Sequence, residues 1–117
     1  MDLESFRKYC LAKNGVVEDF PFGEDTLVYK VMGKIFAITS FDSPLSVNLK
    51  CDPEKAVELR ERFEGVVPGY HMNKKHWNTV DFESGIPQSD LRQFIDHSYE
   101  LVVSSLPRKV RTELDSM

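Results

Sequence analysis

Apolar residues recur every three or four positions in several parts of the chain, which is the spacing of helices that bury one side. The clearest helix start is Asp52-Pro53, which offers a side-chain cap followed by proline at the first helical position. Helices are expected over residues 2–13, from Asp52-Pro53 to Gly65, from Pro87 to Pro107, and over 108–117, where the last helix is short, amphipathic and frayed.

Alternating apolar and polar residues predict the strands. Leu45, Val47 and Leu49 face one way and the polar residues between them the other, so one face of the sheet is packed and the other is wet. Met32-Gly33 joins the plainest pair of strands, because glycine allows the positive φ of a tight hairpin turn. Strands are expected over residues 16–20, 26–31, 34–39, 45–50, 66–67 and 77–82, with a turn at 41–44.

The order of these elements predicts an α+β fold, an antiparallel β-sheet with helices packed on one face. The opposite face of the sheet is then partly open. Hydrophobic residues make up 41% of the chain and charged residues 29%, which is typical of a globular domain. We therefore expect a single domain over residues 1–117, without repeats or linkers.

The chain contains no apolar run of about 18 residues and starts without the basic and apolar regions of a signal peptide. These features predict a soluble, cytoplasmic protein that does not associate with membranes. Cys10 and Cys51 are then expected to be reduced thiols. Cys10 lies on the apolar stripe of the first helix, so burial is its favoured interpretation. Cys51 precedes a helix start, where the dipole could lower its pKa, but no functional role is expected for it.

Residues 68–80, PGYHMNKKHWNTV, resemble the signature of the MmcQ/YjbR family. Further blocks look like those of the family in the same order: FPFG at 20–23, VYKVMGKIFA at 28–37, NLKCDPEKA at 48–56 and SYELVVSSLPRKVR at 98–111. The resemblance implies a CyaY-like fold with helices on an antiparallel sheet. It also implies DNA binding through a double-wing arrangement, an implication that rests on fold analogy.

Lys74, Lys75 and His76 lie in a stretch, residues 66–80, that contains no Asp or Glu. One interpretation is a patch that contacts phosphates, since clustered cations release counterions on binding. The alternative is an ordinary solvated loop, with His76 bonded to a neighbouring carbonyl. Asn73 is expected to cap a short helical turn over MNKK. The net charge of −4 means that any polyanion would be held by this local patch against the repulsion of the remaining surface.

Trp77 is expected on the open face of the sheet, because Val80 and Phe82 suit the core and alternate residues point to opposite sides. By the same alternation, Lys30, Ser46, Asn48 and Lys50 share that open face. A tryptophan flanked by lysines can stack a nucleic-acid base. The same surface would also serve to dock a protein. A third interpretation is that Trp77 is covered by the last helix or by a second subunit.

Pro68, Gly69 and Tyr70 are interpreted as scaffolding, a turn followed by an aromatic lid. Asn78 is expected to point inward and to tie this loop to the sheet, since a buried amide needs hydrogen-bond partners.

His71 and His76 are separated by four residues, and on a loop this H-x4-H spacing matches no established zinc signature, so no metal or other cofactor is expected. No motif pairs a nucleophile with a base, so an enzyme is not expected. Two hypotheses remain. The first is a DNA-binding module that uses Lys74, Lys75, His76, Trp77, Lys30, Lys50, His71 and Asn73. The second is a protein-interaction or small-ligand-binding module around Trp77.

Overall fold

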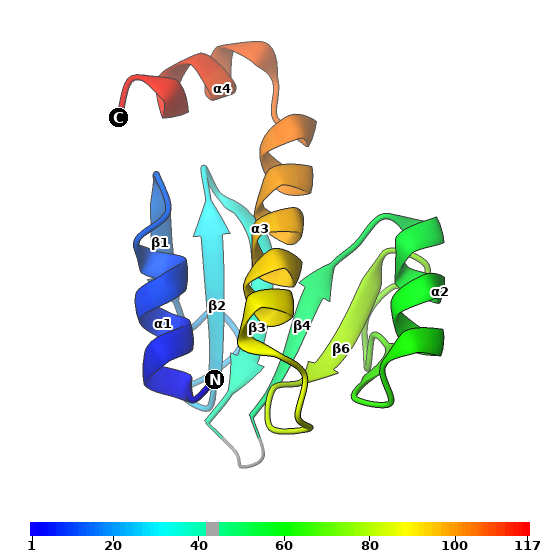
Figure 1. Cartoon of the computed structure of the whole chain (residues 1–117). Coiled ribbons are helices and arrows are strands. Elements are labelled where there is room, and N and C mark those ends of the chain that lie inside the picture. The colour runs from blue at the N-terminus through cyan, green and yellow to red at the C-terminus, as the bar shows by residue number, and fades with distance from the viewer. Residues whose placement is uncertain (42–44) are drawn as a thin grey trace.

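A six-stranded antiparallel sheet carries the fold in the computed structural model, which describes residues 1–41 and 45–117 (Figure 1). Its strand order is β1-β2-β3-β4-β6-β5. The strands are β1 Val16–Asp19, β2 Thr26–Val31, β3 Lys34–Ser40, β4 Ser46–Lys50, β5 Val66–Pro68 and β6 Trp77–Asp81. The helices in the described residues are α1 Leu3–Leu11, α2 Pro53–Arg62, α3 Gln88–Ser105 and α4 Arg108–Asp115.

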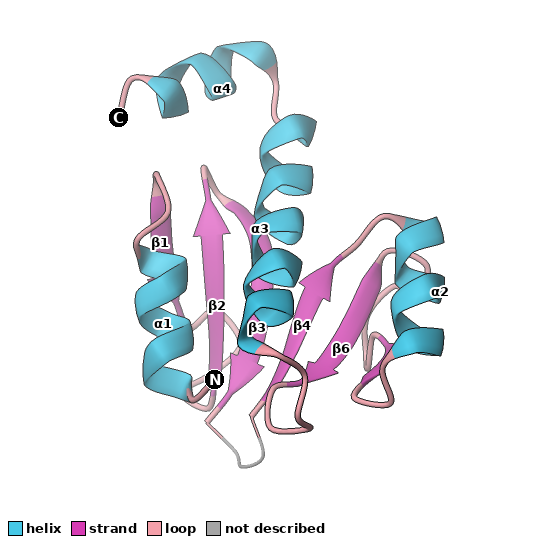
Figure 2. Ribbon diagram, in the orientation of Figure 1, coloured by secondary structure: helices cyan, strands magenta, loops and turns pink. Residues whose placement is uncertain are grey.

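The helices lie on one face of this sheet, as the sequence predicts. Figure 2 shows α1 and α3 crossing in front of the strands, with α2 beside β6. The family resemblance implied the same α+β arrangement. None of the described helices is both long and apolar enough to cross a bilayer.

The first two helices begin where the sequence places their caps. The Asp2 carboxylate accepts the backbone N–H of Ser5 at 2.8 Å. Asp52 accepts the N–H groups of Glu54 and Lys55 at 3.1 and 3.2 Å, immediately before α2. These side chains satisfy donors that a helix N-terminus leaves unpaired, which explains why the two boundaries were predictable.

The β2–β3 hairpin turns at Met32-Gly33, as predicted, but both residues adopt positive φ, 49° and 83°. Two left-handed residues in succession define the turn that matches the twist of a hairpin, and methionine is an uncommon occupant of it. The register then shifts, with Tyr29 opposite Ala37 and Lys30 opposite Ile35. The turn expected over residues 41–44 includes positions 42–44, which lie outside the described residues.

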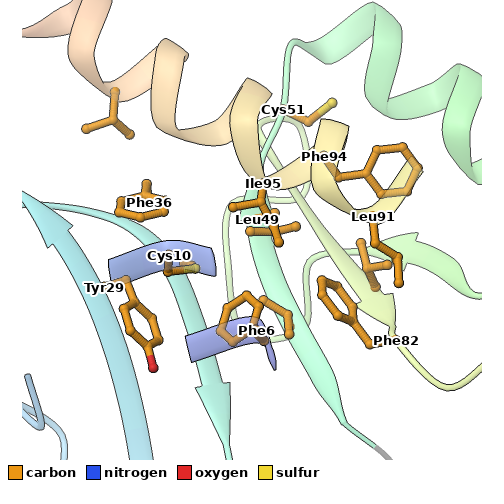
Figure 3. Packing of buried hydrophobic residues seen from close by; sticks show 14 of the residues in the cluster. Phe6, Cys10, Tyr29, Phe36, Leu49, Cys51, Phe82, Leu91, Phe94 and Ile95 are labelled. Atoms are coloured by element: carbon orange, nitrogen blue, oxygen red, sulfur yellow. The ribbon is translucent and has the colours of Figure 1, made fainter. Parts of the chain in front are cut away.

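The core fills the space between the helices and the sheet (Figure 3). The Phe6 ring makes edge-to-face contacts with Tyr29 and Phe82, at centroid distances of 5.4 and 5.5 Å. Leu91 and Ile95 of α3 are fully buried against the same cluster. Burial of these side chains supplies most of the driving force for folding.

α4 is anchored, contrary to the expectation of a frayed helix. Leu114 is only 3% exposed, and its carbonyl accepts the Asn14 side-chain N–H at 2.8 Å. The Tyr99 hydroxyl donates to the Asn14 carbonyl at 2.7 Å. α4 therefore folds back over the connection between α1 and β1 (Figure 1). The hydrogen bond between Asn14 and Leu114 joins residues 100 positions apart, so no local sequence pattern could reveal it.

Candidate functional site

A hollow of about 710 Å³ opens on the face of the sheet that carries no helix. Its size lies in the range of small-molecule sites in proteins. The described lining consists of apolar, aromatic, hydroxyl and amide side chains together with one histidine: Phe22, Thr26, Ile35, Ile38, Thr39, Ser40, Ser46, Asn48, Tyr70, His71, Met72, Trp77 and Thr79. None of these residues is Asp, Glu, Lys or Arg.

A row of side chains crosses four strands on the face of the sheet that carries no helix, and its members from β3, β4 and β6 form the floor of the hollow. The pairing places Val28 beside Ile38, Ile38 beside Asn48, and Asn48 beside Thr79. Val28 has no exposed surface although it lies opposite the helical face. The row therefore changes from apolar at β2 and β3 to hydrogen-bonding at β4 and β6.

Two loops form the rims of the hollow. The loop after β1 contributes Phe22, and the loop between β5 and β6 contributes Tyr70, His71 and Met72. Phe22 and Tyr70 are 67% and 68% exposed, so two large rings stand in water at the mouth. Exposed apolar surface gathered at one place on a protein is typical of binding sites.

His71 adopts a φ of 58°, a left-handed conformation that is uncommon outside glycine. Its ring lies 4.0 Å from the ring of Tyr70, centroid to centroid. Uncommon backbone conformations cluster at functional sites because the surrounding structure has to hold them. Here that structure is the loop from Gly69 to His76.

Hydrogen bonds fix this loop to β6. The Thr79 hydroxyl accepts the Tyr70 N–H at 2.8 Å, and the Gly69 N–H donates to the Trp77 carbonyl at 2.8 Å. Asn73 caps the turn as expected, since its side-chain oxygen accepts the Lys75 N–H at 3.0 Å. A Cβ at Gly69 would lie 2.8 Å from Trp77 Cβ, so glycine allows this close approach. Pro68 ends β5 directly before the loop.

Asn78 is buried, at 2% exposure, but its partners differ from the expected ones. Its side-chain oxygen accepts from Arg60 Nε at 2.7 Å, and its Nδ2 donates to the Ala56 carbonyl at 3.5 Å. Asn78 therefore ties β6 to α2 rather than to the loop.

Arg60 is a residue that sequence reasoning missed. Its guanidinium bonds to the carbonyls of Lys74 and Trp77 as well as to Asn78, so it fastens the loop to α2. The available signal was its spacing, because Arg60 follows the buried Ala56 by one helical turn and shares its face.

Three of the lysines that the DNA-binding hypothesis groups have different neighbours in the structure. Lys30 Nζ lies 2.9 Å from Asp19 Oδ2, and this contact holds the pKa of Asp19 below its usual value. Lys74 Nζ donates to the Gly69 carbonyl at 2.9 Å. Lys75 lies beside α2, where it borders a depression with Val57.

Of the other proposed site residues, some line the hollow and one acts through its backbone. Trp77 lines the hollow, on the open face that alternation predicts, and Lys50 is its direct partner across β4 and β6. His71 lines the hollow as well. His76 is half-buried, and its carbonyl accepts the Cys51 N–H at 2.7 Å.

The cysteines lie in the core and not in the hollow. Cys51 is 5% exposed, and burial raises its pKa to about 11. Burial also raises the pKa of Cys10. Within residues 1–41 and 45–117, no three side chains of His, Cys, Asp or Glu gather in a way that could hold a metal ion.

A family model described as YjbR matches residues 11–101, a span that includes all six strands and the whole described lining of the hollow. The chain belongs to the YjbR family. The YjbR protein of Escherichia coli (strain K12) is 32% identical over 112 residues, which cover 95% of both chains. The YbdF protein of Escherichia coli O157:H7 is 40% identical over 91 residues, 77% of this chain and 75% of YbdF.

Solved structures show the same YjbR fold. The crystal structure of the Deinococcus radiodurans protein DR2400 superposes with a TM-score of 0.92 at 36% identity, over 97% of this chain and 87% of that one. A Pseudomonas syringae protein gives a TM-score of 0.76 at 26% identity, over 86% of this chain and 98% of its own.

Proposed function

We propose that this YjbR chain is a binding module for a small, uncharged, largely apolar organic molecule, which it holds in the hollow on the helix-free face. The observation that carries the proposal is the lining, a hollow of about 710 Å³ whose described residues include no formally charged side chain. Burial of an apolar ligand there gains about 25 cal/mol for each Å² removed from water. The aromatic rims formed by Phe22 and Tyr70 add to that gain.

The ligand is bound in the hollow and is not chemically changed there. No hydrogen bond within the described part of the chain joins His71 to a hydroxyl or a thiol, and its ring contacts that of Tyr70. A nucleophile matched to a base is the usual minimum for covalent catalysis. The hollow offers shape and hydrogen-bonding groups instead.

DNA binding stays a prediction from the family resemblance, and the positions of the cations weigh against it. Lys30 is paired with Asp19, and Lys75 lies beside α2. Affinity for a polyanion depends on the number of phosphates that a protein neutralises together. An uncharged ligand needs no cluster of cations, so the hollow suits an uncharged ligand better than a polyanion.

The test uses the fluorescent probe N-phenylnaphthylamine, which is neutral and brightens in apolar sites. We expect saturable binding, seen as energy transfer from Trp77, the one tryptophan of the chain. Ile38→Ala removes apolar surface from the floor and should weaken binding about five- to tenfold.

The matched control is Val57→Ala, a truncation at an exposed position of α2 outside the hollow, which should leave the affinity unchanged. Circular dichroism checks that both variants fold. Absence of saturable binding by the unmodified protein, or equal weakening by the two variants, would refute the proposal.

A further inference from the structure

The hydrogen bonds at the polar end of the floor indicate what kind of molecule the hollow accepts. Thr79 and Asn48 face each other across β6 and β4. The Thr79 hydroxyl accepts the Tyr70 N–H at 2.8 Å, and it bonds to Asn48 Oδ1. In that second contact the Thr79 hydroxyl is the donor and the asparagine oxygen accepts. The oxygen of the Asn48 amide therefore faces Thr79 in this structure.

The NH₂ group of the Asn48 amide, Nδ2, carries two N–H donors. The neighbour of Asn48 on its other side is Ile38, which has no acceptor in its side chain. Over residues 1–41 and 45–117, no group accepts a hydrogen bond from Asn48 Nδ2. Asn48 lines the hollow, so these donors are available to a molecule bound there.

Trp77 supplies a further donor from the adjacent strand. Its side chain lies on the same face as Thr79, two residues away, and lines the hollow. Its indole N–H likewise has no acceptor within the described residues. A donor that loses water without gaining a partner costs about 1–3 kcal/mol, so a ligand that covers these groups has to offer acceptors to them.

The rings around the hollow indicate the shape of the ligand. Trp77, Tyr70, His71 and Phe22 are flat side chains drawn from one strand and both rims. Flat rings prefer to contact other flat rings, by stacking or edge to face. The described lining contains no lysine or arginine to pair with an anion, and an unpaired buried carboxylate is strongly disfavoured.

We propose that the ligand is a planar heteroaromatic molecule with a neutral acceptor on its edge, a carbonyl oxygen or a ring nitrogen, which receives hydrogen bonds from Asn48 Nδ2 and Trp77 Nε1. This inference rests on the proposed function, because it assumes that the hollow is occupied by a small molecule.

Three probes of nearly equal size test the inference. Isoquinolinone is neutral and carries a carbonyl acceptor, naphthalene has the same shape without an acceptor, and naphthoate is an anion. Binding is followed in ¹H–¹⁵N spectra, where the single indole N–H resonance of Trp77 reports on its hydrogen bond. We expect isoquinolinone to bind about tenfold more tightly than naphthalene, with naphthoate weakest, and to shift the indole resonance.

Asn48→Asp keeps the oxygen that accepts from Thr79 and removes the N–H donors, so it should abolish the preference for isoquinolinone over naphthalene. Asn73→Asp is the matched control outside the hollow, since it retains the oxygen that accepts from Lys75, and the preference should persist. Trp77→Phe keeps a ring, loses the N–H and should reduce the preference even if Asn48→Asp fails to fold.

The outcomes separate this inference from the proposed function. If naphthalene or naphthoate binds as tightly as isoquinolinone, or if the preference survives both Asn48→Asp and Trp77→Phe, the acceptor inference is overturned while the hollow remains a binding site. If neither these probes nor N-phenylnaphthylamine binds, both proposals fail.

Discussion

At the scale of single residues, His97 joins α3 to the residue that caps α2 through a hydrogen bond that requires a neutral imidazole. The Asp52 N–H donates to His97 Nε2 at 3.1 Å. Burial, together with the nearby Lys55 ammonium, lowers the pKa of His97 from its ordinary value of 6.5. A protonated ring has no lone pair to accept this bond.

A base whose pKa is lower in the folded state than in the unfolded state binds more protons when unfolded. The stability that His97 contributes is therefore present above pH 6.5, its unfolded pKa, and is lost progressively as the pH falls below that value. His97→Gln places an amide oxygen near the position of Nε2 and does not titrate.

We expect the unmodified protein to lose about 0.5–1.5 kcal/mol more stability than His97→Gln between about pH 7.5 and pH 5, the net value of one hydrogen bond. Urea unfolding at each pH measures the difference. Parallel pH profiles for the two proteins would show that the bond contributes nothing.

The direction of a side chain could be predicted from the local sequence, whereas its contact partner could not. The inward direction of Asn78 and the outward direction of Trp77 followed from the alternation of β6 alone. The partner of Asn78 did not, because Arg60 lies 18 positions earlier and comes from another element. Sequence therefore predicted which way these side chains point, and the tertiary structure determined what they meet.

At the scale of elements, α2 supports the loop that forms one rim of the hollow. The Arg60 guanidinium makes hydrogen bonds to Asn78, Lys74 and Trp77 at the same time. A planar guanidinium can serve several acceptors in fixed directions, whereas a lysine ammonium is a compact point charge on a flexible stem.

Arg60→Lys should lower the free energy of unfolding by about 1–3 kcal/mol, because the buried Asn78 oxygen loses its partner. It should also speed hydrogen exchange of the Trp77 N–H, which donates to the Asn73 carbonyl at 3.0 Å within the loop. Arg111→Lys, the same change at an exposed position of α4, is the control and should alter neither quantity.

The strands also show why the hollow itself was not predicted. Alternation in β4 gave its two faces correctly, and Ser46, Asn48 and Lys50 do lie on the helix-free side. In β2 and β3, however, Leu27, Val28 and Tyr29 are all buried, as are Phe36 and Ala37. Continuous apolar runs indicate strands covered on both faces, so this pattern gave no sign of an open hollow beside them.

At the scale of the whole molecule, the net charge of −4 agrees better with an uncharged ligand than with a polyanion. The negative net charge would repel a phosphate backbone but does not repel a neutral molecule. The YjbR fold thus separates a packed helical face, which holds the structure together, from a helix-free face with an uncharged hollow.

The most direct test compares N-phenylnaphthylamine with single-stranded DNA, each followed by Trp77 fluorescence, in salt from about 0.05 M to about 1 M. The account predicts that the probe binds with an affinity that hardly changes with salt and that DNA leaves the emission unaltered. DNA binding that shifts the Trp77 emission and weakens steeply as salt increases, with no binding of the probe, would contradict it.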